Sequence, residues 1–149
     1  HRGCLKAGGK TAAILAHGLD EVHPRKNEPL VNDILDQGGT LLGEHPPNTS
    51  PRNHYFVQRN RLQSGLSLGI IVVEAGEESG TMHTARFANG QGRVLGALVP
   101  QEERKDLQVG NRKLLDQGAT PIANAEDVRD FIDRLKDKER EGYPQRPTP

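Results

Sequence analysis

The chain has 149 residues, which fits one domain with a core of its own, and its twenty basic residues balance twenty acidic ones. A net charge of zero excludes attraction of nucleic acid by overall charge and leaves only a local basic patch as a nucleic-acid site. Aromatic residues make up 3% and Trp is absent, so Leu, Ile, Val and Ala must form the core, which suits a parallel sheet covered by helices.

The single cysteine, Cys4, has no partner for an internal disulfide, and the six histidines lack the spacing of metal ligands. His17, His23 and His54 fall in predicted turns, so loop or surface positions are expected for them. No stretch has the length and apolar character of a signal peptide or a membrane-spanning helix. We therefore expect a cytoplasmic protein without metal and without membrane contact.

The first half of the chain alternates short apolar runs with turns. A buried strand is predicted at 11–16 (TAAILA), followed by a turn at 17–20. Apolar residues at helical spacing predict a helix over 26–37, which a glycine pair closes. A second strand is predicted at 40–43, and 44–55, with three prolines, is predicted to be a long irregular loop.

The second half repeats this alternation. A helix is predicted over 56–67 and a strand over 69–74 (GIIVVE), whose continuous β-branched run is expected near the centre of the sheet. A helix at 80–91, a strand at 93–99 and a short helix at 110–117 follow.

The last predicted helix is amphipathic, with Asn124 and Asp127 as its cap. Its apolar residues, at i, i+3, i+4 and i+7, are Val128, Phe131, Ile132 and Leu135. We expect the domain to extend over 1–136 and the charged, then proline-rich tail over 137–149 to be disordered. Strands that alternate with helices predict a mostly parallel sheet with helices on both faces, a Rossmann-like α/β fold.

Two motifs resemble those of enzymes but have the wrong context. GCLKAGGKT at 3–11 has the lysine and threonine of a phosphate-binding P-loop, but its glycine spacing differs and a strand follows it instead of a helix. GLSLG at 65–69 has the spacing of a hydrolase nucleophile elbow, yet a helix precedes it, so Ser67 is expected to end that helix. We predict no catalytic residue.

The strongest candidate for a binding site is FVQRNR, which opens the helix predicted after the long loop. Arg59 and Arg61 offer planar guanidinium groups that match phosphate oxygens. Asn60 offers hydrogen bonds to a base edge, and Phe56 offers a stacking surface for an unpaired base. No acidic residue lies within 45–73, which favours an anionic ligand. Solvated arginines beside a core phenylalanine are an alternative of equal weight.

Two further segments place polar groups at helix starts that follow strands. Ser79, Gly80 and Thr81 carry hydroxyls and free amides suited to a phosphate, although a plain capped helix has the same sequence. The residues at the next helix start are Asn111, Arg112 and Lys113. Three such loops at one edge of a sheet would form a groove for an anion.

Several segments in one order resemble the DNA-processing proteins DprA and Smf, which act in bacterial natural transformation. The resemblance covers almost the whole of 1–135. Its segments are the stretch 1–27, the acidic Pro-Pro loop at 44–47, FVQRNRLQSGLSLGIIVVEA at 56–75, ESGTMHTARFA at 78–88 and GNRKLLDQGATPI at 110–122. Several motifs in one order at matching spacing are more specific than any one of them.

The resemblance implies a Rossmann-like domain that binds and protects single-stranded DNA without strict sequence preference and delivers it to a RecA-type recombinase. It further implies a homodimer in the full-length protein, no enzymatic activity and no cofactor. The residues it implies as DNA contacts are Phe56, Arg59, Asn60, Arg61, Ser79, Gly80, Thr81, Asn111, Arg112 and Lys113.

The chain departs from the family's pattern in two respects. Val57 and Gln58 stand where a proline and a basic residue are usual, which removes a positive charge and predicts weaker DNA binding. The family's first two strands, which belong near the middle of the sheet, have no counterpart in this sequence. We therefore expect a fragment whose strands have unpaired edges.

Two alternatives stay open. Related Rossmann-like proteins bind nucleotides or cleave nucleoside monophosphates in the same groove, but they have a glutamate after a glycine-rich run. Here EAGEESGTMHTA at 74–85 is followed by no acidic residue until Glu102, so a general acid or base is missing from that position. The other alternative is a degenerate copy that binds no DNA.

Overall fold

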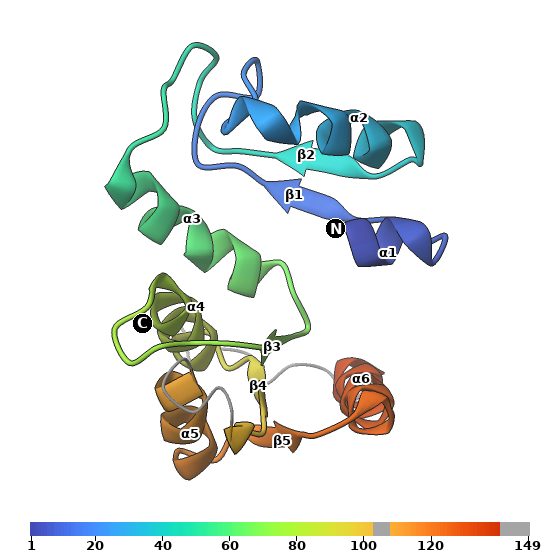
Figure 1. Cartoon of the computed structure of the whole chain (residues 1–149), viewed down its shortest axis with the longest axis vertical. Coiled ribbons are helices and arrows are strands. Elements are labelled where there is room, and N and C mark those ends of the chain that lie inside the picture. The colour runs from blue at the N-terminus through green and yellow to red at the C-terminus, as the bar shows by residue number, and fades with distance from the viewer. Residues whose placement is uncertain (103–107, 141–149) are drawn as a thin grey trace. The chain divides into compact units, whose positions relative to one another are not determined.

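The computed structural model describes residues 1–102 and 108–140 and divides the chain into two compact units, His1–Leu62 and Gln63–Pro149 (Figure 1). Each unit has a parallel sheet of its own, with two strands in the first and three in the second. Helix α3, Asn53–Gly65, begins in the first unit and ends in the second. The length of the chain predicts one domain, whereas the structure has separate cores in its two units.

The first unit is built around a strand–helix–strand connection. Strand β1, Ala12–Ile14, pairs in parallel with β2, Thr40–Leu42. Between them lie the 3-10 turn η1, Arg25–Asn27, and helix α2, Glu28–Asp36. Both predicted strands and the predicted helix of this unit are confirmed, with shorter bounds.

The sequence does not predict helix α1, Arg2–Lys6, which supplies part of the first core. Leu5 of α1, Ala13 of β1 and Ile34 of α2 are all buried there. Gly39 permits the close approach of the chain to α2, because a Cβ at this position would lie 2.7 Å from the carbonyl oxygen of Ile34.

The loops that follow β1 and β2 are tied to each other. The carboxylate of Asp20 accepts hydrogen bonds from the amide of Asn48 at 2.8 and 2.9 Å. His17 lies in the loop after β1, as expected, but its side chain is buried, and its Nδ1 lies 2.8 Å from the carbonyl oxygen of Gly18. The first half of the turn predicted at 17–20 is therefore buried, whereas Leu19 and Asp20 are exposed.

The second unit is a three-stranded parallel sheet between helices. Its strands, in the order β3-β4-β5, are β3 (Gly69–Val72), β4 (Val94–Leu98) and β5 (Thr120–Ile122). Its helices are α4 (Gly80–Gly90), α5 (Val109–Asp116) and α6 (Ala125–Arg140). α4 and α5 pack on one face of the sheet and α6 on the other (Figure 1). The predicted Rossmann-like arrangement, with helices on both faces of a parallel sheet, is confirmed.

Small residues let the helices of the second unit lie close to its sheet. Ala85 and Ala88 of α4 and Ala97 of β4 are at most 1% exposed. On the other face, a Cβ at Gly96 would lie 3.3 Å from the ring of Phe131. The larger core side chains are Val72, Met82, Leu95 and Leu114 on the side of α4 and α5, and Ile122, Phe131 and Leu135 on the side of α6.

The central strand of the described sheet is β4, and not β3. The middle residues of β4, Leu95 to Ala97, are all buried, whereas β3 pairs with β4 alone. The prediction that 69–74 lies at the centre is therefore wrong for the part of the chain that the structure describes. A continuous apolar run indicates that both faces of a strand are covered, and it does not report how many strands flank it.

Each sheet has unpaired edges among residues 1–102 and 108–140. β1 pairs only with β2, and β3 pairs only with β4. At the far side of the second sheet, Pro121 of β5 lies opposite Ala97 of β4. Every open sheet has two such edges, so the expectation that the chain is a fragment stays a prediction.

Helix α6 has the predicted cap. Asn124 Oδ1 accepts hydrogen bonds from the amides of Glu126 (2.8 Å) and Asp127 (3.2 Å). In return, Asp127 Oδ2 accepts hydrogen bonds from the amides of Ala123 (2.7 Å) and Asn124 (3.2 Å), so the first turn is satisfied reciprocally. The helix continues to Arg140, so the disorder predicted to begin at 137 is wrong for 137–140. The rest of the predicted tail, 141–149, lies outside the described residues.

Replacing Asn124 with alanine should lower the free energy of unfolding by about 1 kcal/mol, because two amides at the start of α6 lose their acceptor. Asn89→Ala, at an exposed position in the last turn of α4, is the matched control and should change stability by less than about 0.5 kcal/mol. Urea unfolding followed by circular dichroism measures both variants. Equal stability of Asn124→Ala and the wild type would contradict a stabilising cap.

Candidate nucleic-acid interface

Three of the predicted DNA contacts lie together on α3. Phe56, Arg59 and Asn60 are spaced three and four residues apart, which places them on one side of a helix. The Arg59 guanidinium lies over the Phe56 ring, 5.8 Å from its centroid, and Arg59 Nε donates a hydrogen bond of 3.2 Å to Asn60 Oδ1. Phe56 is 37% exposed, whereas Asn60 is buried at 8%. Of the three side chains, the phenylalanine ring is the accessible one.

Arg59 is anchored within the first unit. Its Nη1 donates a hydrogen bond to the carbonyl oxygen of Ile14, the last residue of β1. Burial lowers the pKa of the Arg59 guanidinium, but arginine stays protonated in proteins, so the group is a cation next to the exposed ring. Arg59 therefore ties α3 to the carboxyl end of β1 and places positive charge behind the Phe56 ring.

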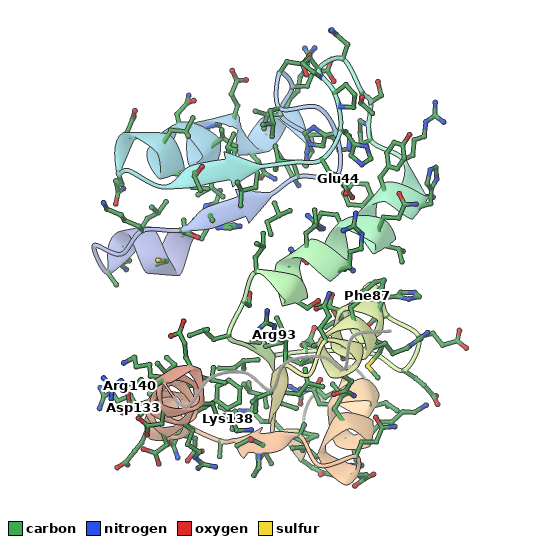
Figure 2. All side chains as sticks on the ribbon, turned by 180° about the vertical axis from the view of Figure 1, so that it is seen from behind. Glu44, Phe87, Arg93, Asp133, Lys138 and Arg140 are labelled. Atoms are coloured by element: carbon green, nitrogen blue, oxygen red, sulfur yellow. The ribbon has the colours of Figure 1, made fainter. Side chains whose placement is uncertain are left out.

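Arg61 lies elsewhere on the helix. Five residues correspond to about 140° around a helix axis beyond a full turn, so Arg61 does not share the side of Phe56. It forms an ion pair with Glu44, in the loop after β2, and the two side chains are 44% and 32% exposed. Figure 2 shows the Glu44 carboxylate next to α3. The structure brings Phe56, Arg59 and Asn60 together but separates Arg61 from them and gives it an acidic partner.

In the second unit, the predicted contacts Ser79, Gly80 and Thr81 lie at the start of α4, and only Gly80 is exposed. Ser79 is the N-cap residue, but its side chain makes no capping hydrogen bond, and its Oγ is buried without a partner among the described residues. Nothing lies within 4 Å of a Cβ built at Gly80, and Thr81 is half-buried. A plain capped helix, the alternative interpretation of this sequence, would use the Ser79 hydroxyl as its cap. Here the Ser79 hydroxyl does not cap the helix, and the partial positive charge of the helix start suits an anion.

Asn111, predicted to contact DNA, is fully buried instead. It is 0% exposed, and its amide is used within the second unit. Oδ1 accepts a hydrogen bond from the amide of Ala75 at 2.8 Å. Nδ2 lies 3.3, 3.0 and 3.1 Å from the carbonyl oxygens of Val72, Val73 and Leu98. The prediction that this side chain contacts DNA is therefore wrong. The Asn111 amide has no exposed surface and is hydrogen-bonded to four backbone groups, so a ligand cannot reach it.

Arg112 and Lys113, the next two residues, are exposed. Lys113 Nζ lies 4.0 Å from Glu77 Oε1, and the two side chains are 51% and 66% exposed. A pair this open contributes little, about 0 to 1 kcal/mol, so a phosphate can compete with the carboxylate. These two cations are the groups of the predicted 111–113 loop that a ligand can reach.

Sequence reasoning underrated the acidic residues beside these cations. Glu74, Glu77 and Glu78 are all exposed in the loop between β3 and α4. With Glu44 in the first unit, they place carboxylates next to predicted phosphate contacts, which opposes anion binding at long range. The signal was present in the sequence EAGEES, since each acid lies within five residues of Ser79.

The ten predicted residues fall into two groups. The four on α3 belong to the first unit, and Ser79 to Thr81 and Asn111 to Lys113 belong to the second. Within the second unit, the two loops are neighbours, because the amide of Gly110 donates a hydrogen bond of 2.8 Å to the carbonyl oxygen of Ala75. A single groove formed by both units stays a prediction.

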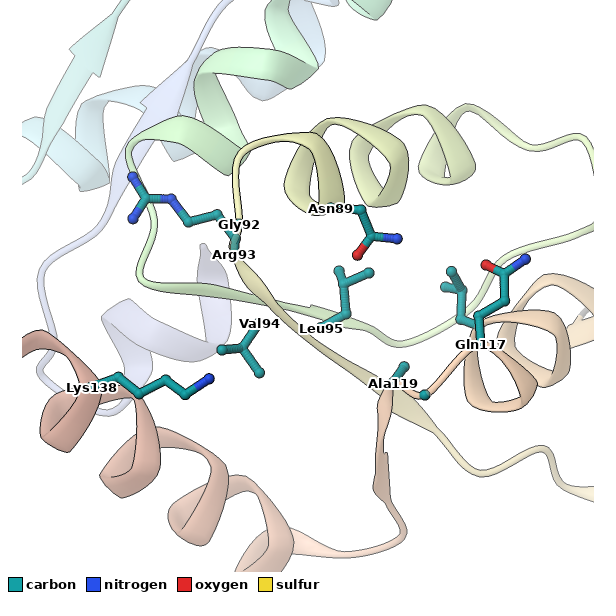
Figure 3. A pocket seen from close by; sticks show the side chains of 10 residues that line it. Asn89, Gly92, Arg93, Val94, Leu95, Gln117, Ala119 and Lys138 are labelled. Carbon is teal, nitrogen blue, oxygen red and sulfur yellow. The ribbon is translucent and has the colours of Figure 1, made fainter. Parts of the chain in front are cut away.

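A pocket of about 340 Å³ lies at the opposite end of the strands of the second unit, where β4 and β5 begin (Figure 3). Lys138 of α6 points into it, whereas Arg93 points away and donates a hydrogen bond of 2.6 Å to the carbonyl oxygen of Gly65. The C-terminal ends of α4 and α5 border the pocket, and helix C-termini disfavour anions. It is therefore no extension of the candidate DNA surface.

The GLSLG motif has a structural role. Ser67 follows α3, and its Oγ donates a hydrogen bond of 2.6 Å to the carbonyl oxygen of Gln63, which confirms it as a helix-ending residue. Within 1–102 and 108–140, no three His, Cys, Asp or Glu side chains gather as metal ligands would. In the same residues, no helix combines the length and the apolar character needed to cross a membrane.

The sequence matches the family described as DNA recombination-mediator protein A over residues 1–133. It is 42% identical over 128 residues to the DNA processing protein DprA of Bacillus subtilis, covering 86% of this chain and 42% of that protein. It is 39% identical over 128 residues to protein Smf of Escherichia coli, covering 86% of this chain and 34% of that protein. The chain thus spans less than half the length of these two relatives.

Solved structures of DNA processing protein A have a similar fold. DNA processing protein A of Streptococcus pneumoniae superimposes with a TM-score of 0.77 at 33% identity, over 86% of this chain and 44% of that one. DNA processing protein A of Helicobacter pylori, described for its single-stranded DNA binding mode, has the same fold, with a TM-score of 0.72 at 24% identity over 91% of this chain and 70% of that one. The chain belongs to the DNA recombination-mediator protein A family, which includes the DNA-processing proteins DprA and Smf.

Proposed function

We propose that this chain binds and protects single-stranded DNA during DNA uptake and delivers it to a RecA-type recombinase. Membership of the DprA and Smf family supports this role, as does the single-stranded DNA binding mode for which the Helicobacter pylori relative is described. The role is that of a non-enzymatic binding protein in the cytoplasm, with the full-length protein a homodimer.

The observation that carries the proposal is the exposed Phe56 ring with the Arg59 cation behind it. Unpaired bases expose their π-faces, and stacking on an aromatic ring captures them without regard to sequence. A ring 37% exposed beside a fixed cation offers a stacking surface close to positive charge. Duplex DNA keeps its bases stacked on each other, so this arrangement favours the single strand.

The second unit supplies groups for the phosphates. The start of α4 provides partial positive charge, and Arg112 and Lys113 add full charges at the neighbouring helix start. Carboxylates near these cations lower the net attraction, so we expect weak binding that depends on salt.

Phe56→Ala should weaken binding of a labelled oligothymidine by about 1 to 3 kcal/mol, the contribution of one base stacked on an aromatic ring. Phe56→Tyr keeps the ring and should bind within about twofold of the wild type. Fluorescence anisotropy measures the dissociation constants, with thermal unfolding as a check that each variant folds. If Phe56→Tyr binds as weakly as Phe56→Ala, the ring does not act by stacking.

The variant Arg112→Ala/Lys113→Ala should weaken oligothymidine binding and reduce the slope of log K against log salt by about 0.7 for each phosphate that the variant no longer neutralises. Arg134→Ala, at an exposed position of α6 on the other face of the sheet, is the matched control and should leave the slope unchanged. Titrations at several salt concentrations decide the outcome. Equal slopes in the double variant and the control would remove the α5 start from the interface.

Arg59→Ala is a poor test of DNA contact in either direction. The substitution removes the hydrogen bonds to Ile14 and Asn60 as well as the charge. Leaving the carbonyl oxygen of Ile14 unpaired costs stability by itself, so weaker binding by this variant would have two explanations.

A further inference from the structure

Asn111 joins three segments of the second unit through one side chain. Its Oδ1 accepts a hydrogen bond from the amide of Ala75, in the loop that leads to α4. Its Nδ2 lies within hydrogen-bond distance of the carbonyl oxygens of Val72 and Val73 at the end of β3 and of Leu98 at the end of β4. Asn111 itself belongs to the first turn of α5. The carboxyl ends of two strands and the start of a helix therefore meet at one amide.

Two residues that precede Asn111, Gln108 and Gly110, add contacts around this junction. The amide of Gly110 donates a hydrogen bond of 2.8 Å to the carbonyl oxygen of Ala75. A Cβ at Gly110 would lie 2.7 Å from the carbonyl oxygens of both Ala75 and Gly76, so only glycine allows this approach. Gln108, the N-cap residue, is 3% exposed and accepts a hydrogen bond of 2.9 Å from the amide of Gln101.

Both candidate phosphate-binding loops of this unit start from the junction. Ala75 lies four residues before Ser79, and Lys113 lies two residues after Asn111. The distance between the start of α4 and the cations of α5 is therefore set where Asn111 fixes Ala75 against α5. Two phosphate contacts on one strand require such a fixed distance, because successive phosphates have a defined spacing.

We propose that Asn111 is a positioning residue for single-stranded DNA, which holds the Ser79–Thr81 loop and the Arg112–Lys113 pair at the separation that lets both contact one strand. The proposal rests on the proposed function. Asn111 touches no DNA itself. An amide suits this place because it provides one acceptor for the Ala75 amide and two donor hydrogens for the strand-end carbonyls, which no carboxylate or hydroxyl provides.

The test compares three variants with the wild type in oligothymidine titrations over a range of salt. Asn111→Ser keeps a small polar group but cannot reach all four backbone partners, and Gly110→Ala pushes α5 away from Ala75 without touching the Asn111 amide. Each should weaken binding about tenfold, the equivalent of one hydrogen bond to a charged group, and lower the salt slope by about 0.7. Because Asn111→Ser and Gly110→Ala should both displace α5 from Ala75, the test remains possible if one of the two variants fails to fold.

Leu135→Ala is the stability control. It removes a core side chain on the α6 face, away from both loops, and should destabilise the unit while leaving the affinity and the salt slope within error of the wild type. All titrations are made where circular dichroism shows each variant folded. An Asn111→Ser affinity and slope equal to those of the wild type would overturn the positioning role while leaving the proposed function in place.

Hydrogen exchange measured without DNA distinguishes a failure of the proposed role of Asn111 from a failure of the proposed function. Asn111→Ser should speed exchange of the amides at 79–81 and 109–113 relative to Leu135→Ala, because these loops lose their common anchor. Faster exchange there, together with no oligothymidine binding by the wild type, would contradict the proposed function and leave Asn111 only as the structural anchor of the two loops. Unchanged exchange would overturn the positioning role whatever the DNA titrations show.

Discussion

The second unit depends on the way its strands end. The last residues of parallel strands have backbone carbonyls with no further ladder partner, and buried carbonyls must find donors elsewhere. The Asn111 amide nitrogen provides these donors for both β3 and β4, and its oxygen accepts a hydrogen bond from the Ala75 amide. The helix that carries it is thereby fixed to the sheet by polar bonds, in addition to the apolar contact of Leu114 with the core.

The first unit solves the same problem with a different residue. Arg59 donates to the carbonyl oxygen of Ile14, where β1 ends, and a guanidinium replaces the amide. In both units, therefore, a residue type associated with ligand recognition completes the end of a strand. The accessible side chains among the predicted DNA contacts lie near them in the chain: Phe56 in the first unit, and Arg112 and Lys113 in the second. Each anchor thereby orients the helix that carries the predicted contacts: Arg59 three residues after Phe56, and Asn111 directly before Arg112 and Lys113.

Hydrophobic periodicity predicted the elements well, and it predicted burial of polar residues poorly. Four of the five strands and the cap of α6 follow from local sequence, since short apolar runs and the Asn124–Asp127 pair have local causes, whereas strand β5, Thr120–Ile122, was not predicted. The edge position of β3, the division into two units and the burial of Asn111 depend on contacts between segments far apart in the chain. A polar residue at a helix start has the same sequence signature whether it faces a ligand or a strand end, so residue type alone assigned Asn111 to the wrong side.

Pro121 makes the two edges of the second unit's sheet differ in their ability to pair with a further strand. The amide of Val99 binds the carbonyl oxygen of Ile122, so in a parallel strand the nitrogen of the preceding residue faces the outer edge. A proline there has no hydrogen to donate, which blocks an incoming strand and protects the edge from aggregation. The opposite edge strand, Gly69–Val72, contains no proline. A further strand can therefore pair with β3, whereas Pro121 opposes the pairing of a further strand with β5.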